Sequence, residues 1–524
     1  MKIYKSLFSS VAVASILVLA TACTGDLDVT PIDPNLNTPD KALAEEANYN
    51  QLLAKCYVGL AVSSPDGPSG DADISGIDGG FGQYLRALYN LQELPTDEAV
   101  VGWNDQTLKD LHGLKWGTSD VFVTAGYSRF FYEISICNEV IRQIDGSGIS
   151  SEKMTQYRNE ARAIRALAYY HAIDLFGNVP FITEANGVGS NPTQISRADL
   201  FKWLTEEEIP AFMDQLPANP ENYRAGRGLA YAIMAKLYLN AKVYTGTAMY
   251  DKCAEYCQKI IDLGYQLTPA AEMRNMFCAS NSEYQGIGKE IIFSVWQDAK
   301  NCQGYGGTTY LIWAAVGGEM EPADYGMTGD GWGGLRVTPE FVDKFNENDP
   351  RATFFTEGQD KDINDIGTFT AGYAFPKFNT LQKDGTQSAD NAQYSFSSTD
   401  FPVFRLADIY LMLAECQVVG GVSVNINGKS GIDYYNEVRA RAGQTTSASI
   451  SAQNIIDERA RELAWECHRR SDLVRFDMLT TSSYVWQWKG GTHDGNSVAS
   501  HFNLFPIPAA DITSNTNLKQ NPGY

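Results

Sequence analysis

Helical spacing of apolar residues constrains this sequence more than any other feature. Between residues 152 and 180, apolar side chains recur at intervals of three and four, which places them on one face of an α-helix. Gly177 and Asn178 supply a left-handed C-terminal cap, and Pro180 prevents the helix from continuing. The stretch therefore predicts one long amphipathic helix, with His171 on its apolar stripe as a hydrogen-bonded packing residue.

The same spacing recurs along the chain and predicts pairs of helices. It is found at about 197–216, 226–244, 247–263, 404–419, 431–442 and 452–468. The second and third of these segments are joined by a short Thr-Gly turn, so we expect an antiparallel hairpin that resembles a tetratricopeptide unit. The predicted fold class is mainly α: a scaffold of tetratricopeptide-like helix pairs with long loop-rich excursions and a few short strands.

Two long segments, residues 62–120 and 265–400, break this pattern. Gly, Asn, Asp, Thr and aromatic residues dominate the second, and the first contains SSPDGPSGDADISGIDGGFG. We expect both to be long loops with few strands. Loops of this length in a compact protein are usually functional or disordered, and interleaved Trp and Tyr favour function.

The N-terminus reads as an export signal. Lys2 and Lys5 precede an apolar stretch from about residue 7 to residue 20, and small residues then lead to Cys23. The stretch is too short for a comfortable bilayer span, which takes roughly 18 apolar residues. The sequence Ala-Thr-Ala-Cys has the form of a lipobox, so we expect residues 1–22 to be a lipoprotein signal peptide and Cys23 to be acylated. The alternative is an ordinary signal peptide with a passing cysteine.

The segment that follows contains several aspartates and prolines and predicts a tether over residues 23–40. A single folded domain is then expected over residues 41–524. The chain has 41 basic and 63 acidic side chains, a formal net charge of −22. We expect no nucleic-acid partner, because binding to phosphates needs a cationic face.

Motifs of catalysis are absent from the sequence. It contains no HExxH, GxSxG, Walker loop or paired CxxC, and its five histidines lack ligand spacing. Cys253 and Cys257 lie four apart in a helical segment and could suggest a metal or a disulfide, but their apolar positions favour buried free thiols. No metal and no cofactor are predicted.

Three carboxylates could be taken for the acid and base of a glycosidase. Glu458, Glu462 and Glu466 are four apart on one predicted helix and alternate with arginines. Helical carboxylates beside arginines form ion-pair networks, whereas a glycosidase needs two carboxyls opposed across a sugar cleft. The ion-pair interpretation is favoured, and a binding protein is the alternative to an enzyme.

Aromatic side chains in polar, Gly-rich loops suggest what such a protein would bind. The apolar C–H faces of sugar rings lie against indole or phenol rings, while polar groups at the rim meet their hydroxyls. The candidates are Trp103, Trp116, Tyr305, Tyr310, Trp313 and Trp332. For each one, the competing interpretation is an aromatic that only packs within its loop.

Several stretches carry a resemblance to a known family. They are NLQELPTDEAVVGW, RALAYYHAIDLFGNVPF, FRLADIYLMLAE, ERARELAWECHRRSDLVRFDML and FPIPAADITSNTNLKQNPGY. With them the whole chain resembles the SusD/RagB family of surface lipoproteins from Bacteroidetes. The resemblance implies a tetratricopeptide-like scaffold, no catalysis, and a SusC-like TonB-dependent outer-membrane transporter as partner.

The resemblance also implies site residues. In the starch-binding member of the family an arc of three aromatics cradles the glucan, and by local match these are Trp103, Tyr305 and Trp332. Polar contacts fall on Arg86 and Asp78, and the family's Asn beyond the first Trp is Gln106 here. The longer side chain moves the amide, which bears on oligosaccharide length or linkage preference.

The expected function is therefore capture of starch or malto-oligosaccharides at the outer membrane, facing outward, and delivery to the transporter. The alternatives are the same role for a different glycan, a glycoside hydrolase, and a scaffold that binds only the transporter.

Overall fold

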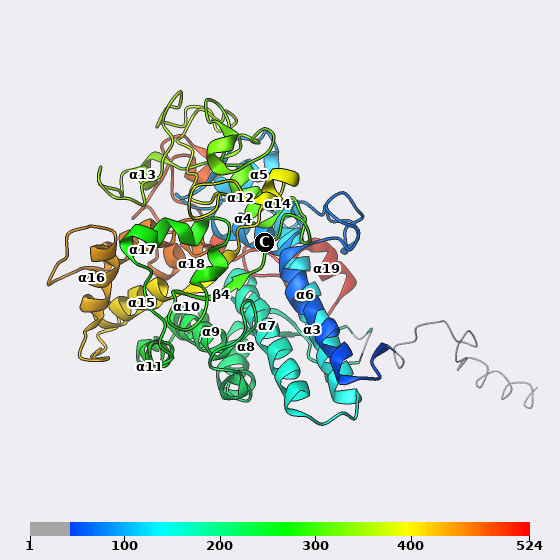
Figure 1. The fold of residues 1–524 in the computed structure, drawn as a ribbon. Coiled ribbons are helices and arrows are strands. Elements are labelled where there is room, and N and C mark those ends of the chain that lie inside the picture. Colours follow the sequence, from blue (N-terminus) through cyan, green and yellow to red (C-terminus); the bar gives the residue numbers. More distant parts are fainter. Residues whose placement is uncertain (1–41, 188, 190) are drawn as a thin grey trace, which may run out of the picture. The chain divides into compact units, whose positions relative to one another are not determined.

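The computed structural model describes residues 42–187, 189 and 191–524 (Figure 1). The signal peptide 1–22, the acylated Cys23 and the tether 23–40 lie outside the described residues. The chain divides into two units, residues 1–50 and 51–524. The boundaries expected from the sequence stay a prediction. No helix in the described part is long and apolar enough to cross a bilayer.

Helix pairs form the scaffold of residues 51–524, which confirms the predicted fold class. The helices of the scaffold are α3 (Glu46–Ala61), α6 (Val121–Gly146), α7 (Glu152–Phe176), α8 (Arg197–Lys202), α9 (Arg227–Leu239), α10 (Ala241–Thr245), α11 (Tyr250–Asp262), α15 (Leu406–Val418), α16 (Gly431–Arg441), α17 (Ala452–Leu463), α18 (Arg469–Arg475) and α19 (Ala509–Ser514). The most extensive packing joins α6 with α7, α9 with α11, and α15 with α16.

The long helix predicted first is α7, and its ends have the expected causes. The Ser151 hydroxyl accepts a hydrogen bond from the backbone N–H of Met154 at 3.1 Å, an N-cap. Gly177 ends the helix with a φ of 72°. Burial extends around most of α7, so it lies in the interior of the unit. His171 is a buried packing residue, 2.8 Å from the Tyr84 hydroxyl, as predicted.

Four of the predicted helices differ from the structure. The segment 226–244 is interrupted at Asn240, which separates α9 from α10. The segment 197–216 forms α8 and then a π-helical turn, Trp203–Glu208, which ends before Pro210 because proline has no N–H to donate. The segment 404–419 begins as a strand before α15. In the segment 452–468 the helix stops at Leu463, because Trp465 takes a φ of 61°.

Three two-stranded antiparallel sheets join distant segments. They are β1 (Val100–Val101) with β5 (Leu335–Arg336), β2 (Val179–Phe181) with β3 (Thr193–Ile195), and β4 (Ile291–Val295) with β6 (Phe401–Arg405). The β4–β6 pair joins residues 291–295 to the strand that follows the 265–400 excursion, so the part of the excursion after β4 leaves and returns at one place. The β1–β5 pair joins this excursion to the other one.

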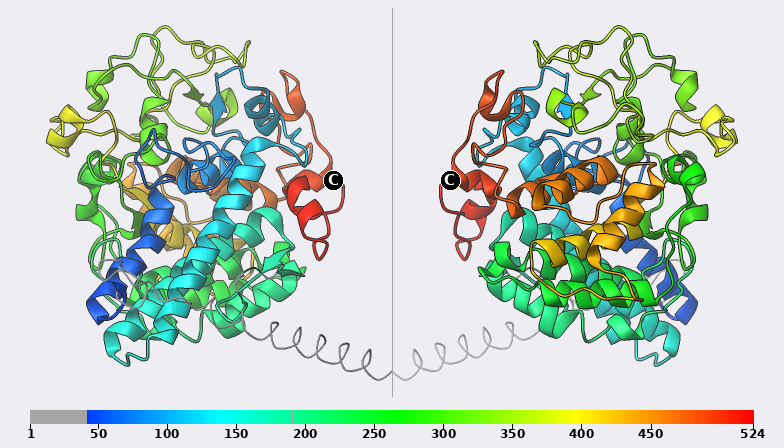
Figure 2. Two further views of the ribbon diagram at one scale, coloured as in Figure 1. Left: turned by 90° about the vertical axis from the view of Figure 1, so that its right-hand side faces the viewer. Right: turned by 90° about the vertical axis from the view of Figure 1, so that its left-hand side faces the viewer.

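The excursions are less irregular than the sequence predicts. Residues 62–120 contain α4 (Tyr84–Gln92), which is mostly buried, and α5 (Gln106–His112). The Gln83 side chain caps α4 by accepting from the Arg86 N–H at 2.9 Å. Residues 265–400 contain only short helices: η3 (Ala270–Phe277), η4 (Asn281–Tyr284), α12 (Gly307–Trp313), η5 (Pro322–Tyr325), α13 (Pro339–Val342) and α14 (Ala389–Gln393). In Figures 1 and 2 its yellow-green loops lie on the side away from α8, α9 and α11.

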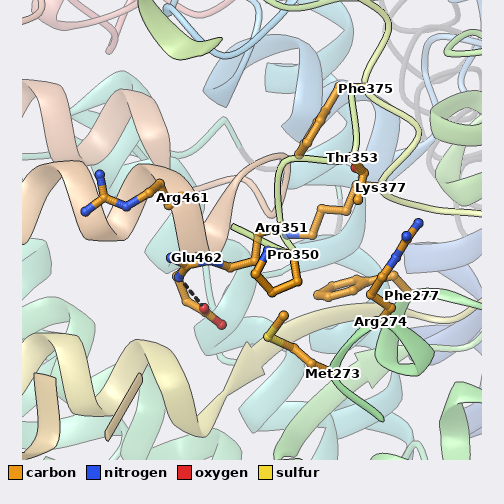
Figure 3. Close-up of a pocket in the computed structure, with 10 residues that line it drawn as sticks. All are labelled: Met273, Arg274, Phe277, Pro350, Arg351, Thr353, Phe375, Lys377, Arg461 and Glu462. Atoms are coloured by element: carbon orange, nitrogen blue, oxygen red, sulfur yellow. Dashed lines mark hydrogen bonds and ion pairs between the residues drawn. The ribbon is translucent and has the colours of Figure 1, made fainter. Parts of the chain in front are cut away.

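A buried ionic network fastens the second excursion to the scaffold. Arg405 of β6 contacts Glu290 at 2.9 Å, Glu462 at 2.6 Å and Glu466 at 2.7 Å. Glu462 also contacts Arg351, at 2.9 Å. Figure 3 shows this last pair beside a cavity of about 30 Å³, which is too small for a sugar ring. The ion-pair interpretation of Glu458, Glu462 and Glu466 is confirmed.

Glu462 is the carboxylate that Arg351, Arg405 and Arg441 share, so its replacement takes one partner from each of these buried cations. We expect Glu462→Gln to lower the free energy of unfolding by about 3 to 5 kcal/mol, as for other broken buried ion pairs. The matched control is Glu437→Gln, which breaks a half-exposed pair with Lys429 and is expected to cost less than about 1 kcal/mol. Denaturant unfolding measures both. Equal losses in the two variants would contradict the account.

Glu133 of α6 gives a pH-dependent prediction. Its side chain is fully buried, and Oε2 has no hydrogen-bond partner among the described residues. A Cβ at position 59 would clash with this oxygen, so the glycine there makes room for it. Burial raises the pKa of Glu133 to about 8, against the attraction of Arg129. The folded state therefore keeps the proton between about pH 4.5 and 8 while the unfolded chain releases it, so stability falls as pH rises through this window.

Glu133→Gln imitates the protonated carboxyl and cannot titrate. We expect the free energy of unfolding of the variant, relative to wild type, to rise by roughly 1 to 3 kcal/mol between pH 5 and pH 8. Chemical denaturation at the two pH values measures it. A difference that stays constant with pH would show that Glu133 is charged in the folded protein.

Candidate functional site

The β1–β5 pair brings two of the three predicted arc aromatics together. Trp103 follows β1 and Trp332 precedes β5, and the backbone N–H of Gly102 donates to the Gly334 carbonyl at 2.8 Å. The Trp103 indole N–H in turn donates to the Trp332 carbonyl at 3.2 Å. Both side chains are half-buried. Two residues that are 229 positions apart in the sequence thus lie side by side.

Tyr305 completes the group. Its ring centroid lies 6.2 Å from that of Trp332, with an interplanar angle of 58°, and its side chain is 41% exposed. Phe396 packs 5.5 Å from Tyr305 on another side. Sequence reasoning missed Phe396, although it is an aromatic in a polar loop like the others. We call Trp103, Tyr305 and Trp332 the aromatic arc.

Close packing sets the position of the Trp103 ring. A Cβ at Gly334 would lie 2.8 to 2.9 Å from three indole atoms of Trp103, so a larger residue would displace the ring. Tyr310, which is fully buried, meets Trp103 edge-on at 6.1 Å. The arc therefore presents rings that are already oriented before any ligand arrives.

Arg86 contacts two residues of the arc and the buried Tyr310 beside them. Its guanidinium lies 4.2 Å from the centroid of the Tyr310 ring and 5.7 Å from that of Trp103. Nη1 donates to the Tyr305 carbonyl at 3.3 Å, and Nη2 has no hydrogen-bond partner among the described residues. Burial lowers the pKa of the guanidinium, opposed by Tyr310 and Asp78. A cation on an aromatic face is stabilised by the ring quadrupole.

Asp78 lies beside Arg86 and Tyr305, whereas Gln106 faces elsewhere. Asp78 is exposed, and its Oδ1 accepts from the Gly80 and Phe81 N–H groups at 2.8 and 3.3 Å. A Cβ at Gly80 would lie within 3.7 Å of side-chain atoms of Asp78, Arg86 and Tyr305, so the three meet there. Gln106 is exposed on α5, and its amide donates to Asp110 at 2.8 Å rather than to the arc.

Three other aromatic candidates are buried packing residues, and the binding role considered for them is wrong. Trp116, Tyr310 and Trp313 are each at most 2% exposed. The Trp116 indole donates to the Tyr524 hydroxyl at 2.7 Å, 408 residues away. The Trp313 carbonyl accepts from the Trp332 N–H at 2.7 Å, so Trp313 supports the arc without joining its surface.

The carboxylates considered for glycosidase chemistry cannot meet a substrate. Glu458, Glu462 and Glu466 are at most 4% exposed and are each bound to at least one arginine. Cys253 and Cys257 are buried free thiols, as predicted.

One cluster in the described residues has the donors for a metal. The Cys56 and Cys137 thiols and a Glu133 oxygen lie within 4.8 Å of one another. Structural zinc sites use four ligands, so this cluster is one donor short, and the absence of a metal stays a prediction.

Sequence and structure comparisons identify relatives of this chain. Residues 354–524 match the model of the SusD family, and residues 37–239 match a model described as "Starch-binding associating with outer membrane". The chain is 32% identical over 576 aligned positions to the Starch-binding protein SusD of Bacteroides thetaiotaomicron, with 100% of this chain and 99% of the relative covered.

Solved structures share the fold. A laminarin binding SusD-like protein matches with a TM-score of 0.68 and 22% identity over 92% of this chain and 100% of its own. The surface glycan-binding protein A of Bacteroides thetaiotaomicron, solved with laminarihexaose, matches with a TM-score of 0.67 and 19% identity over 91% and 99%. Because the first relative is matched along its full length and family models match both ends, this chain belongs to the SusD/RagB family of glycan-binding proteins.

Proposed function

We propose that the protein captures starch and malto-oligosaccharides, α-1,4-linked glucans, on the aromatic arc. The observation that carries the proposal is the convergence of Trp103, Tyr305 and Trp332 at one accessible place. Glucose rings would lie with their C–H faces on these side chains. Arg86 Nη2 would donate to a hydroxyl group, and Asp78 Oδ2, which has no hydrogen-bond partner in the described part of the chain, would accept from one.

The choice of glucan rests on the relatives. The protein that is 32% identical is named a starch-binding protein. The second candidate is another glycan, such as laminarin, because structural neighbours carry that ligand in their descriptions. Retention of all three arc residues favours the α-1,4-glucan. The Gln106 amide donates to Asp110 at 2.8 Å, so this donor is engaged along α5.

Location and partner follow from the N-terminus and the family. In this proposal the signal peptide 1–22 directs export, acyl chains on Cys23 anchor the chain in the outer membrane, and the body faces outward. Each buried methylene of such chains contributes about 0.8 kcal/mol to anchoring. The captured oligosaccharide then passes to a SusC-like TonB-dependent transporter.

The proposed activity is binding without catalysis. Glu458, Glu462 and Glu466 are paired with arginines, and the matched relatives are named as binding proteins. A reducing-sugar assay on starch with the purified protein tests this part, and release of reducing ends at an enzymatic rate would support the hydrolase instead.

Truncation of the arc should weaken binding without unfolding the protein. We expect Trp103→Ala and Trp332→Ala each to lower the affinity for maltoheptaose about 5- to 150-fold, since stacking on an aromatic is worth roughly 1 to 3 kcal/mol. Isothermal calorimetry measures the affinity and thermal unfolding checks the fold. Val419→Ala, an exposed apolar residue on α15's C-terminal side, is the matched control.

Two outcomes would contradict the proposal. Wild-type affinity in both tryptophan variants would remove the arc as the binding surface. Binding of laminarihexaose with no binding of maltoheptaose would keep the arc and replace the glucan.

A further inference from the structure

An exposed tryptophan, Trp296, lies outside the aromatic arc. Trp296 follows β4, is 37% exposed, and its indole N–H has no hydrogen-bond partner among the described residues. It borders a groove of about 440 Å³ between the later turns of α3, α6 and two loops. We call this the Trp296 groove, and the residues that matter in it are Val58, Asp73, Tyr132, Trp296, Asn301 and Gln303.

One buried arginine builds the polar side of the groove. Arg129 is 1% exposed, and its Nη1 and Nη2 hold the two oxygens of Asp73 at 2.8 and 2.6 Å. The same guanidinium lies 5.3 Å from the Tyr132 ring. The carboxylate remains 16% exposed. A fixed carboxylate and a fixed ring thus face the groove together.

The apolar side is braced as well. The Trp296 ring packs 6.3 Å from the Tyr223 ring, at 48° between planes. The next residue, Gln297, donates its backbone N–H to Asp400 at 2.9 Å, and its side-chain amide donates to the Trp296 carbonyl at 2.8 Å. Little conformational freedom remains to be lost when a ligand covers the indole.

Two loops connect the groove with the aromatic arc and with Asp78 beside it. The loop that follows α3 supplies Asp73 to the groove and Asp78 to the arc, and residues 296–305 supply Trp296 to the groove and Tyr305 to the arc. Nine residues can span at most ~32 Å. Arg129 Nε also donates to the Gly82 carbonyl at 2.6 Å, which ties the groove to the start of α4. One polymer chain of several sugar units can therefore reach both places.

We propose that the Trp296 groove is a second carbohydrate-binding site, occupied by the same glucan chain that lies on the arc. The glucan class rests on the proposed function. An exposed indole, a tyrosine ring, an anchored carboxylate and two amides are the side chains that sugar faces and hydroxyls require. Because both sites hold one chain, a polysaccharide binds more tightly than a short oligosaccharide that fills the arc alone.

Fluorine NMR tests the site directly. The full chain, purified in detergent and labelled with 5-fluorotryptophan, gives nine resonances for its 9 Trp residues, and Trp→Phe variants assign Trp103, Trp296 and Trp332. On titration with maltoheptaose we expect the Trp103 and Trp332 resonances to move first. The Trp296 resonance should move at higher concentration and should still move in the Trp332→Ala protein.

Affinity electrophoresis in gels containing amylopectin gives the second readout. We expect Trp296→Ala to weaken retention about tenfold, while its affinity for maltoheptaose at the arc stays within twofold of wild type. Trp296→Phe, which keeps a flat ring, should be intermediate, and Val485→Ala, another exposed apolar residue, should match wild type.

The outcomes separate the two proposals. A Trp296 resonance that stays still while the arc saturates, with wild-type retention of Trp296→Ala, overturns the second site alone. A moving Trp296 with still arc resonances overturns the arc and supports the groove. If no resonance moves, both fail for this glucan.

Discussion

The architecture depends on the ion pairs that Arg405, at the end of β6, makes with buried carboxylates. Arg405 is 1% exposed and binds three carboxylates. Glu290 lies just before β4, Glu462 lies in α17, and Glu466 lies just after α17. Burial of ions is costly unless every one is paired, so this arrangement tolerates little displacement of the segments it joins. With the β4–β6 pair it holds the two ends of residues 296–400 together, so the loops between them start and end at a rigid place.

From that base, the excursions are long enough to place side chains where helices cannot. The β1–β5 pair then joins the two excursions, and Trp103 and Trp332 lie at its end. Arg86, next to Trp103, contacts the Tyr310 ring and the Tyr305 backbone. Binding residues lie on loops, but the loops are held by strand pairing and buried cations. This is how a mainly helical scaffold obtains oriented, accessible rings.

Local signals predicted most of the scaffold. Periodicity and capping residues predicted α7 and α11 to within a few residues, and α9 except for the break at Asn240, because these helices depend on nearby sequence. Elements were missed where a distant contact decides the conformation. The predicted helix after residue 452 ends at Leu463, where the Trp465 indole donates to the Glu98 carbonyl at 2.7 Å. The buried α4 was missed within a Gly-rich segment.

The candidate site shows the same division. Residue composition indicated that loop aromatics would matter, and the family resemblance selected three of them. Composition could not separate Trp103 from Trp116, because exposure depends on pairing with residues hundreds of positions away. The Trp296 groove has no short motif, since its polar side depends on Arg129 and Asp73, which are 56 residues apart.

The central claim is that glucose units lie on the rings of Trp103, Tyr305 and Trp332. A crystal structure of the protein with a bound malto-oligosaccharide tests it most directly. The account predicts sugar rings stacked against these three side chains, with hydroxyl groups within hydrogen-bond distance of Arg86 or Asp78. Sugar bound on another face, with the arc left open to solvent, would contradict it.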